Sequence, residues 1–166
     1  MDGDDFSALW APWRVEYFKA GAASPDFLLT AATSSNDAEH LVVARRALTF
    51  LIMNRYPYAV GHLMAVPNRK VGELSELTAE EKLELLDLAE LGQRLLRKVV
   101  RAQGFNVGLN LGKCAGAGVA DHLHLHIVPR WEGDHNFMPV LADTRILPDA
   151  IAHLYQKLIA ARGELD

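Results

Sequence analysis

The sequence feature that most constrains this chain is a short run in which histidine alternates with apolar residues. Residues 121–127 read DHLHLHI, with histidine at every second position. Because successive side chains of a β-strand point to opposite faces, His122, His124 and His126 share one face and the apolar residues share the other. The apolar face must be buried, so the run predicts a strand whose second face carries three imidazoles.

Three interpretations of this histidine face are open. In the first, the rings are merely the polar side of a surface strand, where Thr, Lys or Glu would serve equally well. In the second, they bind a metal, because His-x-His is a familiar zinc-ligand spacing. In the third, they form an anion site in which one histidine is a nucleophile and its neighbours donate hydrogen bonds and protons.

Geometry favours the third interpretation. At ~3.4 Å per residue, His122 and His126 lie roughly 13 Å apart along a strand. Since Zn–N bonds are only about 2.0–2.1 Å, one ion would take an adjacent pair and need further ligands elsewhere. Chance placement of three titratable rings in a row is improbable. Only the anion site uses all three rings.

Composition predicts one soluble domain without metal-binding cysteines. The 166 residues are 50% hydrophobic and 23% charged, and the net charge of −4 gives no basic field for nucleic acid. We expect no membrane span, since no apolar run approaches ~20 residues, and the acidic start does not resemble a secretory signal. The single cysteine, Cys114, excludes an internal disulfide and a Cys-x-x-Cys zinc site, which favours a cytoplasmic protein.

The N-terminal third predicts an arm, a loop and a small antiparallel sheet. Residues 1–20 form the arm, whose aromatic residues either anchor it to the core or supply a purine-stacking wall or a dimer contact. Residues 21–39 lack periodicity and predict a loop. The apolar runs 41–44 and 49–54 predict a hairpin, and 62–67 predicts the next strand.

A long amphipathic helix is predicted to cover this sheet. Thr78 and Glu81 form a capping-box pattern at its start. Gly104 is expected to end the helix as a left-handed cap. An apolar stripe of helical period contains Leu85, Leu88, Ala89, Gly92, Leu95, Leu96 and Val99.

The C-terminal part predicts two strands joined by a glycine-rich loop, followed by a helix. The strands are 105–111 and 119–130, and the loop 112–118 between them can turn several backbone N–H groups toward a phosphate. The final helix spans 148–162. Hairpin-connected strands with separate helices indicate a single antiparallel α+β domain over residues 1–166.

The histidine run resembles the motif of the histidine-triad (HIT) nucleotide hydrolases and transferases. The resemblance extends upstream to Asn54, Gly61 and His62, and to the segments 110–112 and 115–118 just before the run. It implies a HIT-like antiparallel sheet with a long covering helix and a C-terminal helix. It also implies a purine nucleotide substrate and a homodimer in which two protomers form one continuous sheet.

Further segments are similar to the bacterial diadenosine tetraphosphate phosphorylase-like branch of this family. They are residues 9–17, 129–131, 133–134 and 136–138. The whole resemblance covers roughly residues 10 to 160. It implies a substrate that carries a nucleotidyl group on a polyphosphate.

The resemblance assigns a role to each candidate catalytic histidine. His124 is the nucleophile, as its position between two neighbouring rings also suggests, and its other nitrogen must be held by an acceptor such as a carbonyl. His126 donates to the phosphate or the departing oxygen. His122 supports the array from behind, through His62. On the sequence alone, His62 is equally well a buried core histidine.

The resemblance also assigns substrate-binding roles. Asn54 would bond the ribose hydroxyls, Ile52 and Met64 would line the base pocket, and Asn110 would touch the phosphates. Trp131 would either close that side or simply pack. The sequence departs from several relatives at Gly118, where they carry a Gln or Ser that bonds phosphate, and this leaves room for inorganic phosphate as acceptor. The loop positions assigned to the phosphates are Gly116, Ala117, Gly118 and Val119.

The expected reaction is a two-step displacement at the α-phosphorus through a nucleotidyl-histidine. Water or phosphate then releases the nucleotide. No metal or other cofactor is required by the protein, and Mg²⁺ can accompany the phosphates of the substrate. Two alternatives remain: an AMP-binding regulatory module with little turnover, and a zinc hydrolase.

Overall fold

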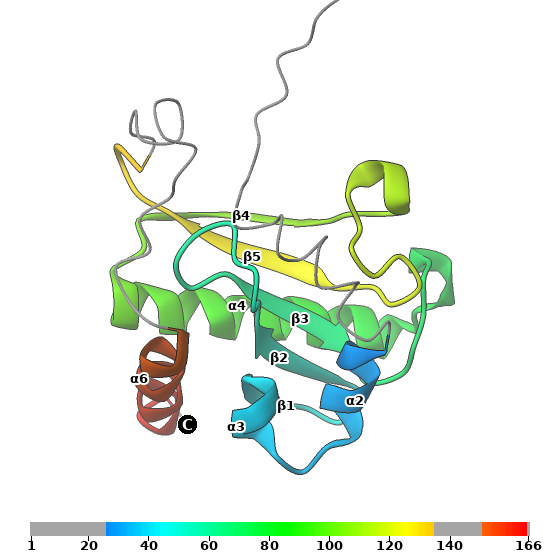
Figure 1. Cartoon of the computed structure of the whole chain (residues 1–166), viewed down its shortest axis with the longest axis horizontal. Helices are drawn as coiled ribbons and strands as arrows, with labels where there is room; N and C mark the ends of the chain where they lie inside the picture. The colour runs from blue at the N-terminus through cyan, green and yellow to red at the C-terminus, as the bar shows by residue number, and fades with distance from the viewer. Residues whose placement is uncertain (1–25, 135–150, 166) are drawn as a thin grey trace, which may run out of the picture.

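The computed structural model describes residues 26–134 and 151–165. Its centre is a five-stranded antiparallel sheet in the order β1-β2-β3-β5-β4, shown in Figure 1. This confirms the predicted α+β class. The strands are β1 (Val42–Arg45), β2 (Thr49–Met53), β3 (Leu63–Pro67), β4 (Gly104–Leu109) and β5 (Leu125–Arg130).

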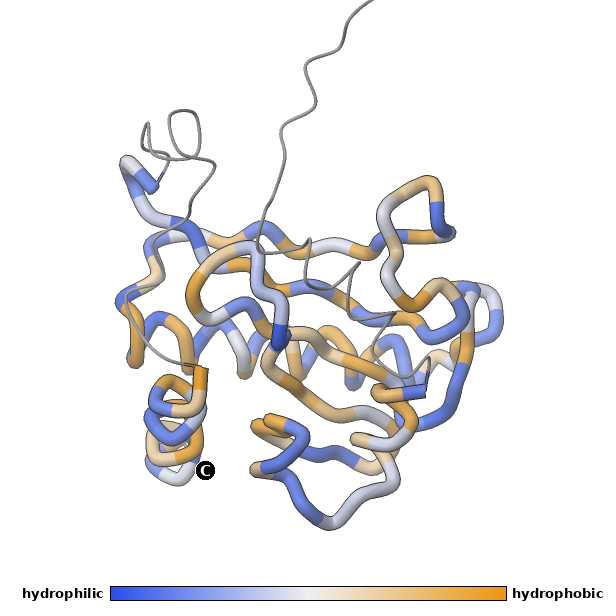
Figure 2. Tube along the Cα trace, viewed as in Figure 1, coloured by the Kyte–Doolittle hydropathy of each residue, from blue (hydrophilic) through white to orange (hydrophobic). Residues whose placement is uncertain are grey.

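Both faces of the inner strands are covered, which explains the continuous apolar runs of β2 and β3. Every residue of these two strands is buried, and their apolar character is visible along the tube in Figure 2. On one face the strands pack against α4 (Ala79–Val100). On the other face they pack against α2 (Phe27–Thr33), which buries Leu28 and Ala31.

Two short helices replace part of the loop predicted for residues 21–39. They are α2 and α3 (Asp37–His40), so that prediction was wrong from residue 27 onward. Helices this short are not stable by propensity and depend on tertiary packing. Leu28 and Ala31 supply that packing, and the Asn36 side chain caps α3 by accepting a hydrogen bond from the Glu39 amide.

The long helix α4 begins as predicted and ends earlier. The capping box is formed in both directions between Thr78 and Glu81, and the predicted apolar stripe faces the sheet. Gly104 is not its left-handed cap, because Arg101 takes that conformation with φ 54°. Gly104 already pairs with Arg130 as the first residue of β4, so the chain must reverse before it.

The strand that carries the histidine motif is shorter than predicted. It was expected over 119–130, but β5 starts at Leu125, because the chain before it is held by another contact. The Leu123 N–H donates to the Val71 carbonyl at 2.7 Å, outside the ladder. His122 and His124 therefore lie on the segment that leads into β5, with His122 at a bend, and of the three histidines only His126 lies within the strand.

The remaining elements are two 3₁₀ turns and one helix. The turns are η1 (Leu74–Glu76) and η2 (Lys113–Ala115), the latter inside the predicted glycine-rich loop. The predicted C-terminal helix is confirmed as α6 (Ile151–Gly163), with Leu154, Tyr155 and Leu158 buried against α4 and β1. The predicted N-terminal arm lies outside the described residues. Among the helices of the described ranges, none combines the length and apolar character that crossing a bilayer requires.

Candidate active site

A pocket of about 400 Å³ opens on the α2 side of the sheet, beside the histidine motif. This volume suits a small organic ligand. Its walls come from α2, from the end of β2 and the turn after it, from the glycine-rich loop and from β5. The described lining residues are Phe27, Ala31, His40, Ile52, Met53, Asn54, Arg55, Tyr56, Tyr58, Met64, Gly116, Gly118, Val119, His124 and His126.

His124 is held in one tautomer by the backbone. Its Nδ1 lies 2.9 Å from the carbonyl oxygen of His122. A carbonyl can only accept, so Nδ1 carries the proton and the lone pair lies on Nε2. Burial lowers the pKa of His124, partly offset by the hydrogen bond to His122, and this favours the neutral ring. The result is a neutral imidazole with one nucleophilic nitrogen.

His126 is oriented by a second chain of hydrogen bonds that starts in the turn after β2. The Tyr58 backbone N–H donates to His62 Nδ1 at 3.1 Å. In a neutral His62 the proton therefore lies on Nε2, which is 2.9 Å from Nδ1 of His126. His126 Nδ1 thus accepts, and the ring proton of His126 lies on Nε2. The pair presents a hydrogen-bond donor beside His124.

The turn after β2 holds His62 from two further directions. The Tyr58 ring stacks on the imidazole, with centroids 4.7 Å apart and planes 24° apart. Asn54 Nδ2 approaches His62 Nδ1 at 3.4 Å, and the Tyr56 N–H fixes the Asn54 amide by donating to its oxygen at 2.8 Å. His62 is buried, but its contacts make it more than a packed core histidine.

The three histidines of the motif do not act from one face. The rings of His124 and His126 meet edge to face, 4.8 Å between centroids, and both line the pocket. His122 instead donates from Nε2 to the carbonyl of Pro67 at 2.9 Å. Its contribution to the pocket is its own carbonyl, which holds His124. The prediction that His62 links to His122 was wrong, because His62 Nε2 bonds to His126 Nδ1.

Most of the predicted substrate-binding residues are brought together. Those that line the pocket are Ile52, Asn54, Met64, Gly116, Gly118 and Val119. Ala117 lies within the same loop, and the Asn110 amide nitrogen is near Gly116, where an added Cβ would lie 3.9 Å from it. Neither residue lines the pocket itself.

Trp131 lies away from the pocket. Its indole N–H is 3.1 Å from the carbonyls of both Val100 and Arg101, at the end of α4. It packs against the core on the α4 side of the sheet. Of the two alternatives for Trp131, packing against the core is therefore correct, and closing the phosphate side of the pocket is wrong.

Several lining residues were missed by sequence reasoning. Phe27 and Ala31 lie in the segment that was taken for a loop, although their i, i+4 spacing is that of one helix face. Arg55, Tyr56 and Tyr58 lie in a proline-containing turn, where the sequence indicates a bend but not its direction. The others are His40 and Met53.

The described ranges contain no group of three or more His, Cys, Asp or Glu residues arranged to hold a metal ion. Cys114 is exposed on η2.

Burial of the histidines predicts a stability that falls in mild acid. Burial lowers the pKa of both His122 and His124 in the folded protein. Below about pH 6.5 the unfolded chain therefore binds protons that the folded chain resists, so the free energy of unfolding decreases as the pH falls. Above that pH both states are neutral at these rings and the effect vanishes.

Urea unfolding at pH 5.5, 7.0 and 8.0 measures this dependence. We expect equal midpoints at the two higher values and a lower midpoint at pH 5.5. His124→Asn, which removes one titrating ring, should show a smaller drop between pH 7.0 and 5.5. A midpoint that is equal or higher at pH 5.5 in the unmodified protein would contradict the assignment of neutral, buried rings.

Comparisons with known proteins agree with this geometry. The family model of the HIT domain matches residues 35–133. An AP-4-A phosphorylase of Mycobacterium tuberculosis is 42% identical over 156 residues, which cover 89% of this chain and 80% of that protein. An asymmetrical bis(5'-nucleosyl)-tetraphosphatase of Schizosaccharomyces pombe is 34% identical over 93 residues, 56% of this chain and 50% of that protein.

The fold is shared with solved structures. A zinc-bound histidine triad family protein from Mycobacterium smegmatis superposes with a TM-score of 0.67 at 24% identity, covering 83% of this chain and 93% of that chain. The match of the family model spans the hairpin, α4 and the histidine motif. This chain therefore belongs to the HIT family.

Proposed function

We propose that this protein is a nucleotidyl hydrolase or transferase that acts on dinucleoside polyphosphates or other nucleotidyl conjugates. The observation that carries the proposal is that His124 and His126 line one pocket with complementary ring nitrogens. The Nε2 of His124 has a free lone pair, and the Nε2 of His126 bears a proton. The names of the two curated relatives, a phosphorylase and a tetraphosphatase, support the same substrate class.

The first step forms a covalent nucleotidyl-histidine. His124 Nε2 attacks the α-phosphorus, an N–P bond forms, and the P–O bond to the departing group breaks. The bonding electrons leave with that oxygen, which His126 stabilises by a hydrogen bond. The phosphorylated ring becomes cationic, and its Nδ1–H remains bonded to the His122 carbonyl, which stabilises that charge.

The second step returns the enzyme to its starting state. An acceptor oxygen, from water or from inorganic phosphate, attacks the same phosphorus and the N–P bond breaks. The electron pair returns to His124 Nε2, and the nucleotide is released. With water as acceptor, both of its protons pass to solvent, one as the new P–O bond forms and one from the resulting P–O–H group. The chain's own histidines supply the chemistry in this proposal, and Mg²⁺ enters only on the phosphates of the substrate.

The pocket walls suit the parts of a nucleotide. Ile52 and Met64 supply an apolar surface for the base, and Asn54 lies where it would bond the ribose hydroxyls. The loop of residues 116–119 would hold the phosphates through backbone N–H groups, with Asn110 beside it. Gly118 lines the pocket without a side chain, which supports room for phosphate as the acceptor.

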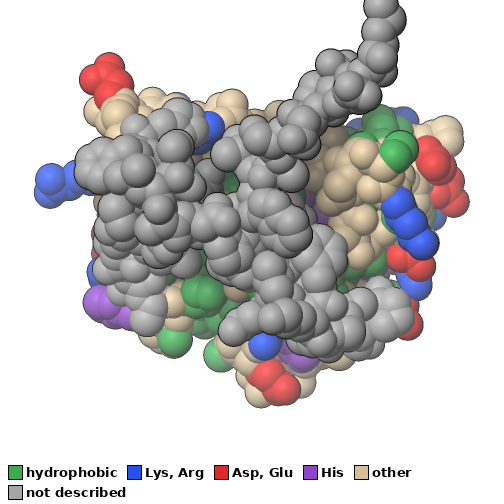
Figure 3. All heavy atoms as spheres, turned by 45° about the horizontal axis from the view of Figure 1, so that its top comes forward, with side chains coloured by type: hydrophobic (Ala, Val, Ile, Leu, Met, Phe, Trp, Pro, Cys, Tyr) green, Lys and Arg blue, Asp and Glu red, His purple; other side chains and the backbone are tan. Residues whose placement is uncertain are grey.

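We also propose a homodimer in the cytoplasm. The strand β4 is at the edge of the sheet, three of its six residues are exposed, and Val107 is 44% exposed. Exposed sheet edges of this kind tend to pair with another strand, so a second copy would continue the sheet. An exposed Cys114 thiol suits a reducing compartment. The net charge of −4 supports a small nucleotide substrate over nucleic acid, and in Figure 3 the visible basic side chains are interspersed with acidic ones near the edge of the face.

Product analysis with diadenosine tetraphosphate tests the proposal. The protein is incubated with this substrate in the presence and absence of inorganic phosphate, and the nucleotides are separated. ADP with ATP indicates phosphorolysis, and AMP with ATP indicates hydrolysis. Tight binding of AMP without turnover of this or another nucleotidyl conjugate would instead favour the regulatory module, and activity lost on chelation and restored by Zn²⁺ alone would favour a zinc hydrolase.

A further inference from the structure

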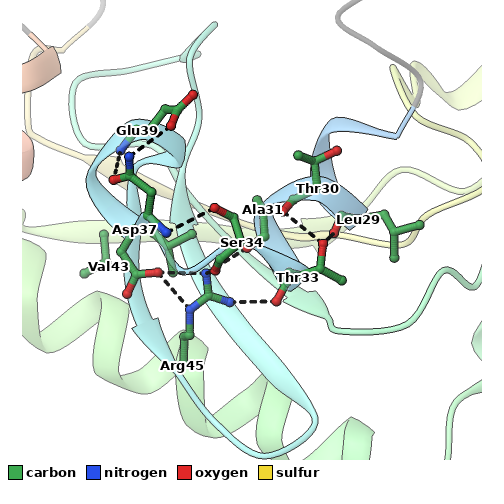
Figure 4. A network of polar contacts seen from close by, with 12 residues as sticks. Leu29, Thr30, Ala31, Thr33, Ser34, Asp37, Glu39, Val43 and Arg45 are labelled. Atoms are coloured by element: carbon green, nitrogen blue, oxygen red, sulfur yellow. Dashed lines mark hydrogen bonds and ion pairs between the residues drawn. The ribbon is translucent and has the colours of Figure 1, made fainter.

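Arg45 joins the helical wall of the pocket to the sheet. It is the last residue of β1, and its guanidinium contacts three carbonyl groups and one carboxylate, as Figure 4 shows. Nη1 donates to Ala32 at 2.9 Å. Nη2 donates to Ala31 at 2.7 Å and to Ser34 at 2.9 Å. Nε donates to the Asp37 carboxylate at 2.8 Å.

These contacts satisfy the end of one helix and the start of the next. The carbonyls of Ala31 and Ala32 belong to the last turn of α2, where helix carbonyls lack partners inside the helix. The last turn of α2 has no basic residue of its own, so Arg45 supplies the positive charge that this end favours. Asp37 is the first residue of α3. One side chain therefore fixes both helices.

The arginine itself is held in place by the sheet. Arg45 pairs with Phe50 of β2, and its guanidinium carbon lies 5.9 Å from the centroid of that buried ring. The ion pair with Asp37 is partly exposed and is worth little alone. The three carbonyl contacts are charge-assisted hydrogen bonds in a fork that lysine does not reproduce.

The two helices form part of the pocket wall. Phe27 and Ala31 of α2 and His40 of α3 line the pocket, and Ala31 also gives its carbonyl to Arg45. His124 and His126 line the same pocket, from the segment before β5 and from β5 itself. A seven-residue helix has little stability of its own, so its position depends on such contacts.

We propose that Arg45 is a positioning residue that sets the nucleoside end of the pocket. It acts through α2 and α3 and does not touch the reacting atoms. Its loss should weaken nucleotide binding, because Phe27 and Ala31 lose their fixed place, while His124 and His126 keep theirs. The inference rests on the proposed nucleotidyl function, and it names the part of the site that determines substrate affinity.

Arg45→Met tests this role, with Arg46→Met as a matched control. Arg46 is the exposed neighbour, and within the described ranges its side chain has one hydrogen bond, to the Arg45 carbonyl at 3.2 Å. The measurements are the Kd for AMP and the KM and kcat for diadenosine tetraphosphate. For Arg45→Met we expect Kd and KM to rise about tenfold (~1.4 kcal/mol) with kcat within about threefold. Arg46→Met should match the unmodified protein, and Arg45→Lys should lie between the two.

Each other outcome is decisive. Unchanged Kd and KM in Arg45→Met would overturn the inference, as would a loss of kcat at constant KM, which indicates only fewer folded molecules. If urea unfolding shows that Arg45→Met is not folded, the Kd and KM of Arg45→Lys decide instead, because lysine keeps the positive charge but lacks the forked set of N–H donors. An unmodified protein that neither binds AMP nor turns over the dinucleotide would refute the proposed function, and this inference with it.

Discussion

Replacing His124 with alanine will reduce turnover of diadenosine tetraphosphate by at least about 10⁴-fold, while the protein remains folded. The reason is specific to this ring. Among the histidines that the structure describes, it alone combines a proton fixed on Nδ1, here by the His122 carbonyl, with an Nε2 lone pair in the pocket. Alanine removes the atom that forms the bond to phosphorus. His126 cannot replace it, because its Nδ1 accepts from His62 at 2.9 Å and its Nε2 therefore carries the proton, and His62 does not line the pocket.

Initial rates by nucleotide separation measure this effect, and urea unfolding checks the fold. His153→Ala is the control, since His153 is an exposed residue on α6, far along the chain from the motif. AMP should still bind to His124→Ala, because the base pocket is unchanged. If His124→Ala turned over the substrate at more than about one hundredth of the unmodified rate, the assignment of His124 as the nucleophile would be refuted.

Replacing His62 with phenylalanine will lower kcat by about 10²-fold, with a smaller change in KM. Phenylalanine keeps a ring that can stack on Tyr58, but it has no N–H for Nδ1 of His126. Without this donor, His126 is free to place its proton on Nδ1, and Nε2 then faces the pocket as an acceptor where a donor is needed. The loss falls on the chemical step, since His62 does not line the pocket.

His62→Gln is the matched variant, because its amide can still donate a hydrogen bond. We expect its kcat to lie between those of His62→Phe and the unmodified protein. Equal kcat values for His62→Phe and the unmodified protein would show that the Tyr58–His62–His126 chain has no role in turnover.

The elements that the sequence predicted correctly are those with local signals. The Thr78 and Glu81 side chains make the capping hydrogen bonds within the first turn of α4 itself. The apolar stripe of α4 can be recognised from the spacing of its residues alone. The hairpin of β1 and β2 and the strand β3 follow from short apolar runs. In each case the residues that specify the element lie within it.

The fold predictions were wrong where contacts between residues far apart in the sequence determine the bounds of an element. The helix α2 exists because Leu28 and Ala31 pack on strands that come later in the chain. The helix α4 ends at Val100, with Arg101 as its left-handed cap, because Gly104 pairs with Arg130 of β5. The lead-in to β5 is fixed by the Val71 carbonyl, some fifty residues earlier in the sequence. None of these partners is adjacent in sequence to the residue that it controls.

The sequence predicted which residues line the pocket better than it predicted the hydrogen bonds between them. Alternation identified His124 and His126, and the family resemblance identified Asn54, Ile52 and Met64, which line one pocket. Alternation also placed all three rings on one face, although the contact with Pro67 turns His122 away. The tautomers of both catalytic rings depend on which carbonyl or amide approaches each nitrogen. Only the three-dimensional structure contains that information.

Mass spectrometry of the enzyme during turnover tests the central claim most directly. The protein is mixed with diadenosine tetraphosphate and quenched within the first turnovers in alkaline denaturant, because phosphorus–nitrogen bonds hydrolyse in acid. After digestion, we predict the mass of an adenylyl group on the peptide that contains residues 122–126, localised to His124 and absent in His124→Ala. Continued turnover with no adenylylated peptide, or with the adenylyl group on another residue, would contradict the account.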